Sequence, residues 1–264
     1  PVASTRVTRV RVADVDAAVA QLRTAVTGSP RAALTMRRLL EVTDRLPVRE
    51  GIAAESTAYS MLLAGTEFAA WLAARRRRPA PAPRGDAVVM WREGDELRVR
   101  LNVPGRRNAY SREVRDALVE AFEFAVTDRS VSRIVWDGAG PAFCSGGDLD
   151  EFGSTTDVSS AHVVRMQRSA ALCAHELAAR LEARLHGHCI GAGIEIPSFA
   201  GRLLAADDTV IALPELSMGL VPGAGGTVGI PRRIGRWRCA WLHFTGARID
   251  VDAAIEWGLV DGRW

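Results

Sequence analysis

The front third of the chain has the hydrophobic spacing of α-helices. From Val12 onward, apolar residues recur at steps of three and four positions, which is the period of one buried helix face. These residues are Val15, Ala18, Val19, Leu22, Ala25 and Val26. Gly28, Ser29 and Pro30 should end this helix. Residues 31–78 predict two or three further helices, with breaks near Leu46–Pro47 and Gly65–Thr66.

The composition changes after four consecutive arginines, Arg75–Arg78, where the sequence PAPAPRG follows. A proline-rich segment with so few apolar residues is a stiff linker and not a packed element. We therefore predict an N-terminal helical segment at residues 1–80 and a second unit at residues 81–264. The arginines are interpreted first as a solvated helix end that complements the helix dipole, and second as a phosphate contact.

Beyond the linker, strands and helices alternate. AVVMWRE and ELRVRLNV flank the turn Gly94–Asp95 and predict a β-hairpin, and SRIVWDG predicts a short buried strand. Helices are predicted on the apolar face that includes Val114, Leu118 and Phe122, and over a long stretch from about Ser160 to Glu182. This alternation indicates an α/β fold with mostly parallel strands.

Composition and charge exclude several classes of protein. The 264 residues are 48% hydrophobic and 25% charged, which excludes a disordered or fibrous chain. No apolar run approaches the roughly 18 residues of a membrane span, and we expect a cytoplasmic protein that binds no membrane. All fixed side-chain cations are arginine, and the net charge is only +3. Because these arginines are dispersed among acidic residues, we expect no nucleic-acid partner.

Two glycine-rich loops are the first candidates for chemistry, PAFCSGGDL and HCIGAGIEI. Each follows a predicted strand, where glycine lets backbone N–H groups approach a ligand. Taken alone, either loop is better interpreted as an ordinary glycine turn, because neither matches a nucleotide-binding motif. The His186-x-His188-Cys189 sequence is an incomplete metal site, so no metal is expected.

Five segments together resemble the crotonase (enoyl-CoA hydratase/isomerase) superfamily. LNVPGRRNAYS resembles its LNRP…NA segment, AFCSGGDL its AFxAGxDL loop, and HGHCIGAGIEI its NGxAxGGGxEL loop. LPELSMGLVPGAGGT and TGARIDVDAAIEWGLVD are similar to the PExxLGxxPGxGGT and TGxxIxAxEAxxxGLV segments. The resemblance covers about residues 86–262 and implies a crotonase-like spiral of ββα turns behind an N-terminal α-helical segment.

The resemblance also implies the site. The backbone N–H groups of Ser145 and Ala192 would form an oxyanion hole for a thioester carbonyl, and Glu195 and Glu215 would be the catalytic carboxyls. Two carboxyls facing one water can divide the work, one accepting a proton and the other supplying one. Outside these motifs, the same glutamates would be taken for ordinary surface residues. The substrate contacts implied by the motifs are Arg106, Arg107, Ala109, Gly146, Asp148, Leu149, Gly191, Gly193, Pro214 and Gly223.

Residues 28–79 resemble the helices that follow the core in this family, through SPxAL, ExxxxxxLL and a closing WLxxRxxP. We therefore expect a circular permutation that places these helices first, beside the helix near Val251–Trp257. Trp71 and Arg75 would then join the substrate-binding residues, near the CoA adenine and 3′-phosphate.

The function implied is hydration of an α,β-unsaturated acyl-CoA, or the reverse reaction, by a carbon–oxygen lyase of the enoyl-CoA hydratase type. Coenzyme A enters as part of the substrate, and no other cofactor is expected. The alternatives are an isomerase, a cofactor-independent dioxygenase acting on an aromatic or polyketide-derived acyl-CoA, and a non-catalytic acyl-CoA-binding scaffold. The family resemblance implies a homotrimer or a dimer of trimers, and residues Phe152–Arg168 are expected to set the acyl specificity.

Overall fold

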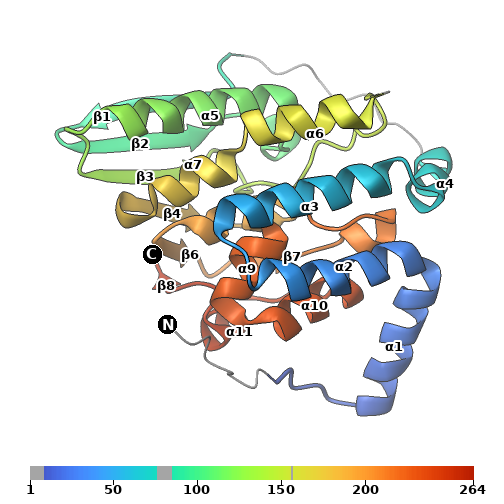
Figure 1. Ribbon diagram of the computed structural model, residues 1–264. Coiled ribbons are helices and arrows are strands. Elements are labelled where there is room, and N and C mark those ends of the chain that lie inside the picture. Colours follow the sequence, from blue (N-terminus) through green and yellow to red (C-terminus); the bar gives the residue numbers. More distant parts are fainter. Residues whose placement is uncertain (1–8, 76–84, 156) are drawn as a thin grey trace.

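The structure is a computed structural model that describes residues 9–75, 85–155 and 157–264. Its front helices match the breaks expected from the sequence (Figure 1). They are α1 (Val15–Gly28), α2 (Pro30–Thr43), α3 (Val48–Leu63) and α4 (Thr66–Ala74). Pro30 opens α2 with its fixed φ, and the Glu67 carboxylate caps that helix by accepting from the N–H groups of Arg31 at 2.8 Å and Ala32 at 3.1 Å.

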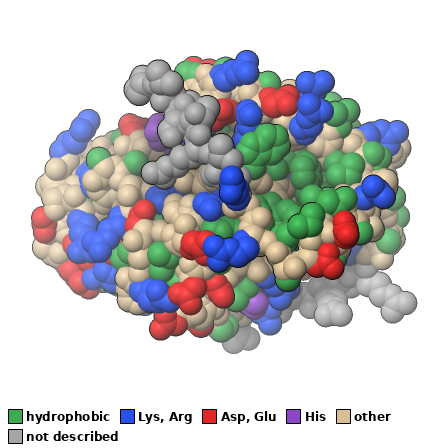
Figure 2. All heavy atoms as spheres, turned by 90° about the horizontal axis from the view of Figure 1, so that it is seen from below, with side chains coloured by type: hydrophobic (Ala, Val, Ile, Leu, Met, Phe, Trp, Pro, Cys, Tyr) green, Lys and Arg blue, Asp and Glu red, His purple; other side chains and the backbone are tan. Residues whose placement is uncertain are grey.

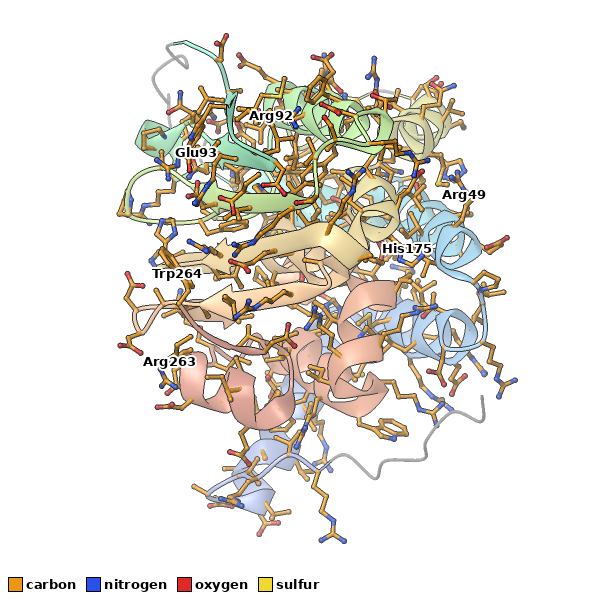
Figure 3. All side chains as sticks on the ribbon, turned by 90° about the vertical axis from the view of Figure 1, so that its left-hand side faces the viewer. Arg49, Arg92, Glu93, His175, Arg263 and Trp264 are labelled. Carbon is orange, nitrogen blue, oxygen red and sulfur yellow. The ribbon has the colours of Figure 1, made fainter. Side chains whose placement is uncertain are left out.

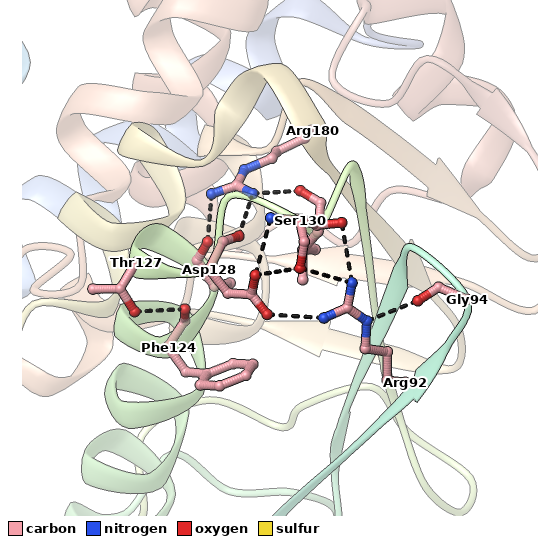
Figure 4. A network of polar contacts seen from close by, with 9 residues as sticks. Arg92, Gly94, Phe124, Thr127, Asp128, Ser130 and Arg180 are labelled. Carbon is pink, nitrogen blue, oxygen red and sulfur yellow. Dashed lines mark hydrogen bonds and ion pairs between the residues drawn. The ribbon is translucent and has the colours of Figure 1, made fainter.

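The predicted hairpin and the first strand–helix–strand unit are confirmed. They comprise β1 (Val88–Glu93), β2 (Glu96–Leu101), the short 3₁₀ helix η1 (Pro104–Arg106), α5 (Arg112–Thr127) and β3 (Arg133–Gly138). The Ser111 hydroxyl caps α5, and Val114, Leu118 and Phe122 are buried on its inner face. Arg180 and Arg92 close the connection from α5 to β3 by donating to backbone carbonyls and to Asp128 (Figure 4).

The predicted long helix from Ser160 to Glu182 is wrong. The chain forms α6 (Val158–Gln167) and α7 (Ala170–Glu176), then a 3₁₀ turn η2 (Ala178–Arg180) and strand β4 (Leu181–Leu185). Ser169 interrupts the helical run because its hydroxyl accepts from the Leu172 N–H and caps a new helix. Leu181 already belongs to a strand that is buried in the sheet.

The C-terminal half completes the sheet and covers it with helices. Its elements are β5 (His188–Ile190), α8 (Ala192–Glu195), η3 (Pro197–Phe199), β6 (Arg202–Ala205), β7 (Val210–Ala212), η4 (Glu215–Met218), α9 (Gly226–Ile234), α10 (Arg236–Thr245), α11 (Val251–Trp257) and β8 (Gly262–Arg263). Strands β1-β2-β3-β4-β6-β8 form one sheet, parallel after the β1–β2 hairpin, and β5 and β7 form a second parallel pair. The predicted α/β fold with mostly parallel strands is confirmed.

The sheet has a helical side and a side with few helices, which Figure 3 shows edge-on with His175 and Arg49 on the helical side. On the other side, Trp264 donates from its indole N–H to the Leu185 carbonyl at 2.9 Å, under the Arg184 guanidinium. Between the sheet and the helices, Trp136 packs edge-on against Phe122 and Phe143, with ring centroids 5.3 and 5.0 Å apart. No helix among the described residues is long and apolar enough to cross a membrane.

Helices α2 and α3 lie side by side and pack on α9, with α2 also against α10 (Figure 1). Met36, Ile52 and Phe68 belong to the same hydrophobic core as the sheet. The sequence pattern predicted that these helices pack beside α11, whereas α2 packs on α9 and α10, and α3 packs on α6 and α9. The expected boundary near 79–85 falls mostly on residues 76–84, outside the described part, so the division into two units stays a prediction.

Helix α1 departs from its sequence pattern. Its apolar stripe predicts a buried face, but none of its residues is buried, and Val15 and Val19 remain 66% and 48% exposed. Figure 2 shows hydrophobic side chains gathered on the right-hand part of the face where α1 lies. Ala18, Leu22 and Ala25 are half-buried where α1 packs on α10 and α2, so the described residues cover the stripe only in part.

Candidate active site

A cavity of about 590 Å³ lies where the front helices meet the two glycine-rich loops. Its walls come from α3, α4, α6 and α8, from the loops that follow β3 and β5, and from η4 with the turn before α9. The cavity therefore joins residues from both ends of the sequence. It contains the predicted glutamates and is large enough for the acyl end of a small thioester.

The two glycine-rich loops are held against each other like strands. The Cys144 N–H donates to the His188 carbonyl and the Ile190 N–H donates to the Cys144 carbonyl, both at 3.1 Å. A Cβ at Gly193 would lie 2.3 Å from the Cys144 carbonyl oxygen, so only glycine permits this approach. Gly193 thus shapes the cavity wall without lining it.

The predicted oxyanion donor Ser145 is wrong. Its backbone N–H donates to the Arg107 carbonyl at 3.0 Å and is therefore already used. Among the described residues of the two loops, the N–H groups of Gly146, Gly147 and Ala192 donate to no backbone carbonyl, and all three residues line the cavity. Ala192 opens α8, whose first N–H groups have no partner within the helix. The N–H group of Ala192, with that of Gly147 or Gly146, is therefore available to an oxyanion.

Glu195 and Glu215 converge as predicted. Glu195 ends α8, Glu215 opens η4, and both are buried. The Oε1 atoms of Glu215 and Glu195 lie 2.7 and 3.7 Å from the position that a Cβ at Gly191 would take. Gly191 adopts φ 51°, so glycine suits both its backbone and its closeness to the carboxyls.

The two carboxyls have different surroundings. Glu195 Oε2 accepts from the N–H groups of Ala224 at 2.7 Å and Gly226 at 3.1 Å. Glu215 Oε2 accepts from no donor among the described residues, and its neighbour His243 Nδ1 is 3.8 Å away. Burial lowers the pKa of His243 to about 3, so this histidine is neutral and supplies no positive charge.

Burial raises the pKa of both carboxyls well above the usual value, and the charge of Glu215 raises the pKa of Glu195 further. The backbone donors oppose this shift at Glu195 because they stabilise the ionised form. When the pair shares one proton, Glu215 is therefore the better place for it. The arrangement provides one carboxylate and one carboxylic acid on the same cavity.

A third buried carboxyl, Glu55 of α3, was not foreseen as a site residue. Its oxygens accept from the Gly225 N–H at 2.6 Å and from the Thr227 N–H and hydroxyl at 2.7 Å. It therefore fixes the turn whose Ala224 and Gly226 amides bind Glu195. Its only signal in the sequence was the ExxxxxxLL pattern, which says nothing of the turn that it binds.

The remaining predicted contacts fall into two groups. Seven line the cavity, namely Gly146, Asp148, Leu149, Gly191, Pro214, Gly223 and Trp71. Arg106, Arg107, Ala109, Gly193 and Arg75 do not line it. Arg106 and Arg75 instead brace the loop behind Leu149, since both donate to the Asp150 carboxylate, at 2.9 and 3.0 Å. Arg76–Arg78 lie outside the described residues. Among the described residues, no group of three or more potential ligands could hold a metal ion.

Known proteins share this core. A family model described as enoyl-CoA hydratase/isomerase matches residues 96–262. The 2,3-dehydroadipyl-CoA hydratase of Escherichia coli K12 is 31% identical over 173 residues, 66% of this chain and 67% of that protein. The enoyl-CoA hydratase of Thermoplasma volcanium superposes with a TM-score of 0.63 and 31% identity, over 68% of this chain and 72% of that one. That of Mycobacterium smegmatis gives 0.62 and 28%, over 67% and 69%. The chain is therefore an enzyme of the crotonase superfamily and belongs to the enoyl-CoA hydratase/isomerase family.

Proposed function

We propose that the enzyme adds water across the double bond of an α,β-unsaturated acyl-CoA, or removes it in the reverse direction. The observation that supports this most directly is the unequal pair of buried carboxyls around Gly191. Hydration needs a proton acceptor for water and a proton donor for carbon, both on one cavity. The name of the Escherichia coli relative, a hydratase of an unsaturated acyl-CoA, agrees with this chemistry.

The oxyanion hole acts on the thioester carbonyl. As the water oxygen bonds to Cβ, the double-bond electrons move toward the carbonyl and give an enolate-like oxygen. The N–H group of Ala192, with that of Gly147 or Gly146, would donate to this oxygen and stabilise it more than the neutral carbonyl. Loss of one such donor typically costs about 3–4 kcal/mol of transition-state stabilisation.

The glutamates move the two protons. Glu195, as carboxylate, accepts a proton from the water that attacks Cβ. Glu215, as carboxylic acid, donates its proton to Cα as the enolate collapses. The product gains one water, and the pair ends with the proton on Glu195 and the charge on Glu215. Return of that proton to Glu215 through the next water restores the starting state.

A panel of enoyl-CoA thioesters tests the proposal. We expect loss of the conjugated thioester absorbance, and oxygen-18 from labelled water in the product. A product of unchanged mass would instead identify an isomerase, and oxygen consumption a dioxygenase. Binding of every thioester without turnover would instead support a non-catalytic acyl-CoA-binding scaffold. An aromatic member belongs in the panel because Phe152, in the segment expected to set the acyl specificity, lines the cavity.

A further inference from the structure

The cavity wall contains a guanidinium that hydration does not use. Arg165 of α6 is partly buried and lines the same cavity as the glutamates. Its Nε donates to the Ser56 hydroxyl at 3.0 Å, and its Nη2 donates to the Ser56 carbonyl and the Ser60 hydroxyl. Nη1 donates to no atom of the described residues, which leaves two N–H groups of a charged side chain without a protein partner.

Arg165 also lacks a counter-ion. No carboxylate of the described residues lies within 4.0 Å of its guanidinium, although burial disfavours its charged form. Arg115, the neighbouring cation, is paired with Asp116 at 2.8 Å. Glu55 spends both carboxyl oxygens on Gly225 and Thr227, and its burial raises its pKa. A partly buried cation is seldom left unpaired unless a ligand supplies the charge.

Tyr59 places Arg165 relative to the reacting groups. The guanidinium carbon lies 5.0 Å from the centre of the Tyr59 ring. The same ring lies 2.6 Å from where a Cβ at Gly223 would sit, in the turn that leads to the Glu195 donors. Arg165 therefore lies beside Tyr59, whose ring contacts the turn that leads to the Glu195 donors, and it lines the same cavity as both glutamates. An acyl group that extends along this cavity past the glutamates could reach it.

We propose that Arg165 binds a carboxylate at the far end of the acyl group, so that the substrates are CoA thioesters of dicarboxylic acids. This inference rests on the proposed function only in taking the cavity as an acyl-CoA site. Serine and tyrosine hold the guanidinium in place, and Nη1 would donate to one oxygen of the substrate carboxylate. Arginine suits this task because it stays charged and its hydrogen bonds to carboxylates are charge-assisted.

Binding of unreactive, saturated thioesters tests the inference separately from catalysis. Calorimetry would compare succinyl-, adipyl- and suberyl-CoA with butanoyl-, hexanoyl- and octanoyl-CoA, pairs that differ only in the terminal group. For the chain length that fits, we expect the dicarboxylic thioester to bind about tenfold or more tightly, as one charge-assisted hydrogen bond provides. Arg165→Met should abolish this preference, and Arg165→Lys should retain part of it.

The control is Arg49→Met, which removes an exposed arginine of α3 that does not line the cavity, and its preference should equal that of the unaltered protein (Figure 3). Equal affinities for both members of every pair in the unaltered protein would overturn the proposal. So would an Arg165→Met variant that binds both members more weakly by the same factor, since Arg165 would then serve CoA or the fold. Either result would leave hydration of other enoyl-CoAs unaffected.

Discussion

The difference between Glu195 and Glu215 comes from the backbone and not from the side chains themselves. Two amides of the turn before α9 favour the carboxylate of Glu195, whereas Glu215 has no such donors. We predict that Glu195→Gln and Glu215→Gln each lower kcat about 100-fold or more, because each removes one proton transfer. The dissociation constant of a saturated acyl-CoA should stay nearly constant. Glu120→Gln, at an exposed position of α5, is the matched control. Near-normal turnover in either variant would contradict the assignment.

The same burial predicts a pH dependence of stability. The folded state raises the pKa of Glu215 from 4.5 to about 8, chiefly by desolvation. Between these values the folded chain keeps a proton that the unfolded chain releases, so the free energy of unfolding falls as the pH rises. We predict that Tm declines from about pH 5 to about pH 8 and that Glu215→Gln makes the decline shallower. Equal slopes for both proteins would count against a protonated Glu215.

The sequence predicted which residues form the site better than it predicted their hydrogen bonds. Glu195 and Glu215 were predicted from the spacing of the family motifs, which does not depend on the hydrogen bonds that these carboxyls make. The choice of Ser145 was wrong because its N–H donates to the Arg107 carbonyl, a contact that the motif does not show. Glu55 could not be foreseen as a site residue, since its partners Gly225 and Thr227 are far away in the sequence.

Among the elements, α3 does more than cover the cavity. Its Glu55 binds three donors of the turn that orients Glu195. We predict that Glu55→Ala lowers both kcat and Tm, because unsatisfied buried donors cost about 1–3 kcal/mol each. Glu55→Gln, which keeps one acceptor oxygen, should recover part of both. Glu50→Gln, exposed on the same helix, should change neither. A normal Tm and kcat in Glu55→Ala would contradict the role of α3 in orienting Glu195.

Helix boundaries show where sequence patterns succeed. The breaks after Gly28 and near Pro47 were predicted because proline and glycine act locally. The apparent helix from Ser160 to Glu182 was misread because apolar spacing continues across Ser169 into β4, and only the sheet distinguishes the two. Tertiary pairing decides short apolar segments of this kind.

We propose that residues 28–79 take the structural place of the helices that follow the core in the resembled family. Their packing on α9 and the shared core fit this proposal. Deletion of residues 1–80 should then expose the apolar partners of Met36, Ile52 and Phe68, and yield an insoluble or molten product. Near-ultraviolet circular dichroism and dye binding would detect that state. A soluble, cooperatively folded and active 81–264 fragment would refute the permutation.

For the whole molecule, residues from both ends of the chain line one cavity. Residues of α3 and α4 line the cavity together with both glycine-rich loops and the turn before α9, so the front helices and the core both contribute to its wall. Among the described residues, helix α1 is covered only in part, by α10 and α2. Its apolar stripe is regular enough for a buried face, yet Val15, Val19 and Val26 stay exposed. A second copy of the chain is the partner that best suits it, because the family resemblance implies a trimer or a dimer of trimers.

We predict that light scattering will find such an assembly at micromolar concentration, and that Val15→Asp with Val19→Asp will shift it toward the monomer. Burying a carboxylate in an apolar interface costs several kcal/mol, whereas on an exposed helix it costs little. The control is Val163→Asp, at a similarly exposed valine of α6, which should leave the mass unchanged. A stable, active monomer in the unaltered protein would contradict the assembly. An unchanged mass in the double variant would show that α1 lies outside the interface.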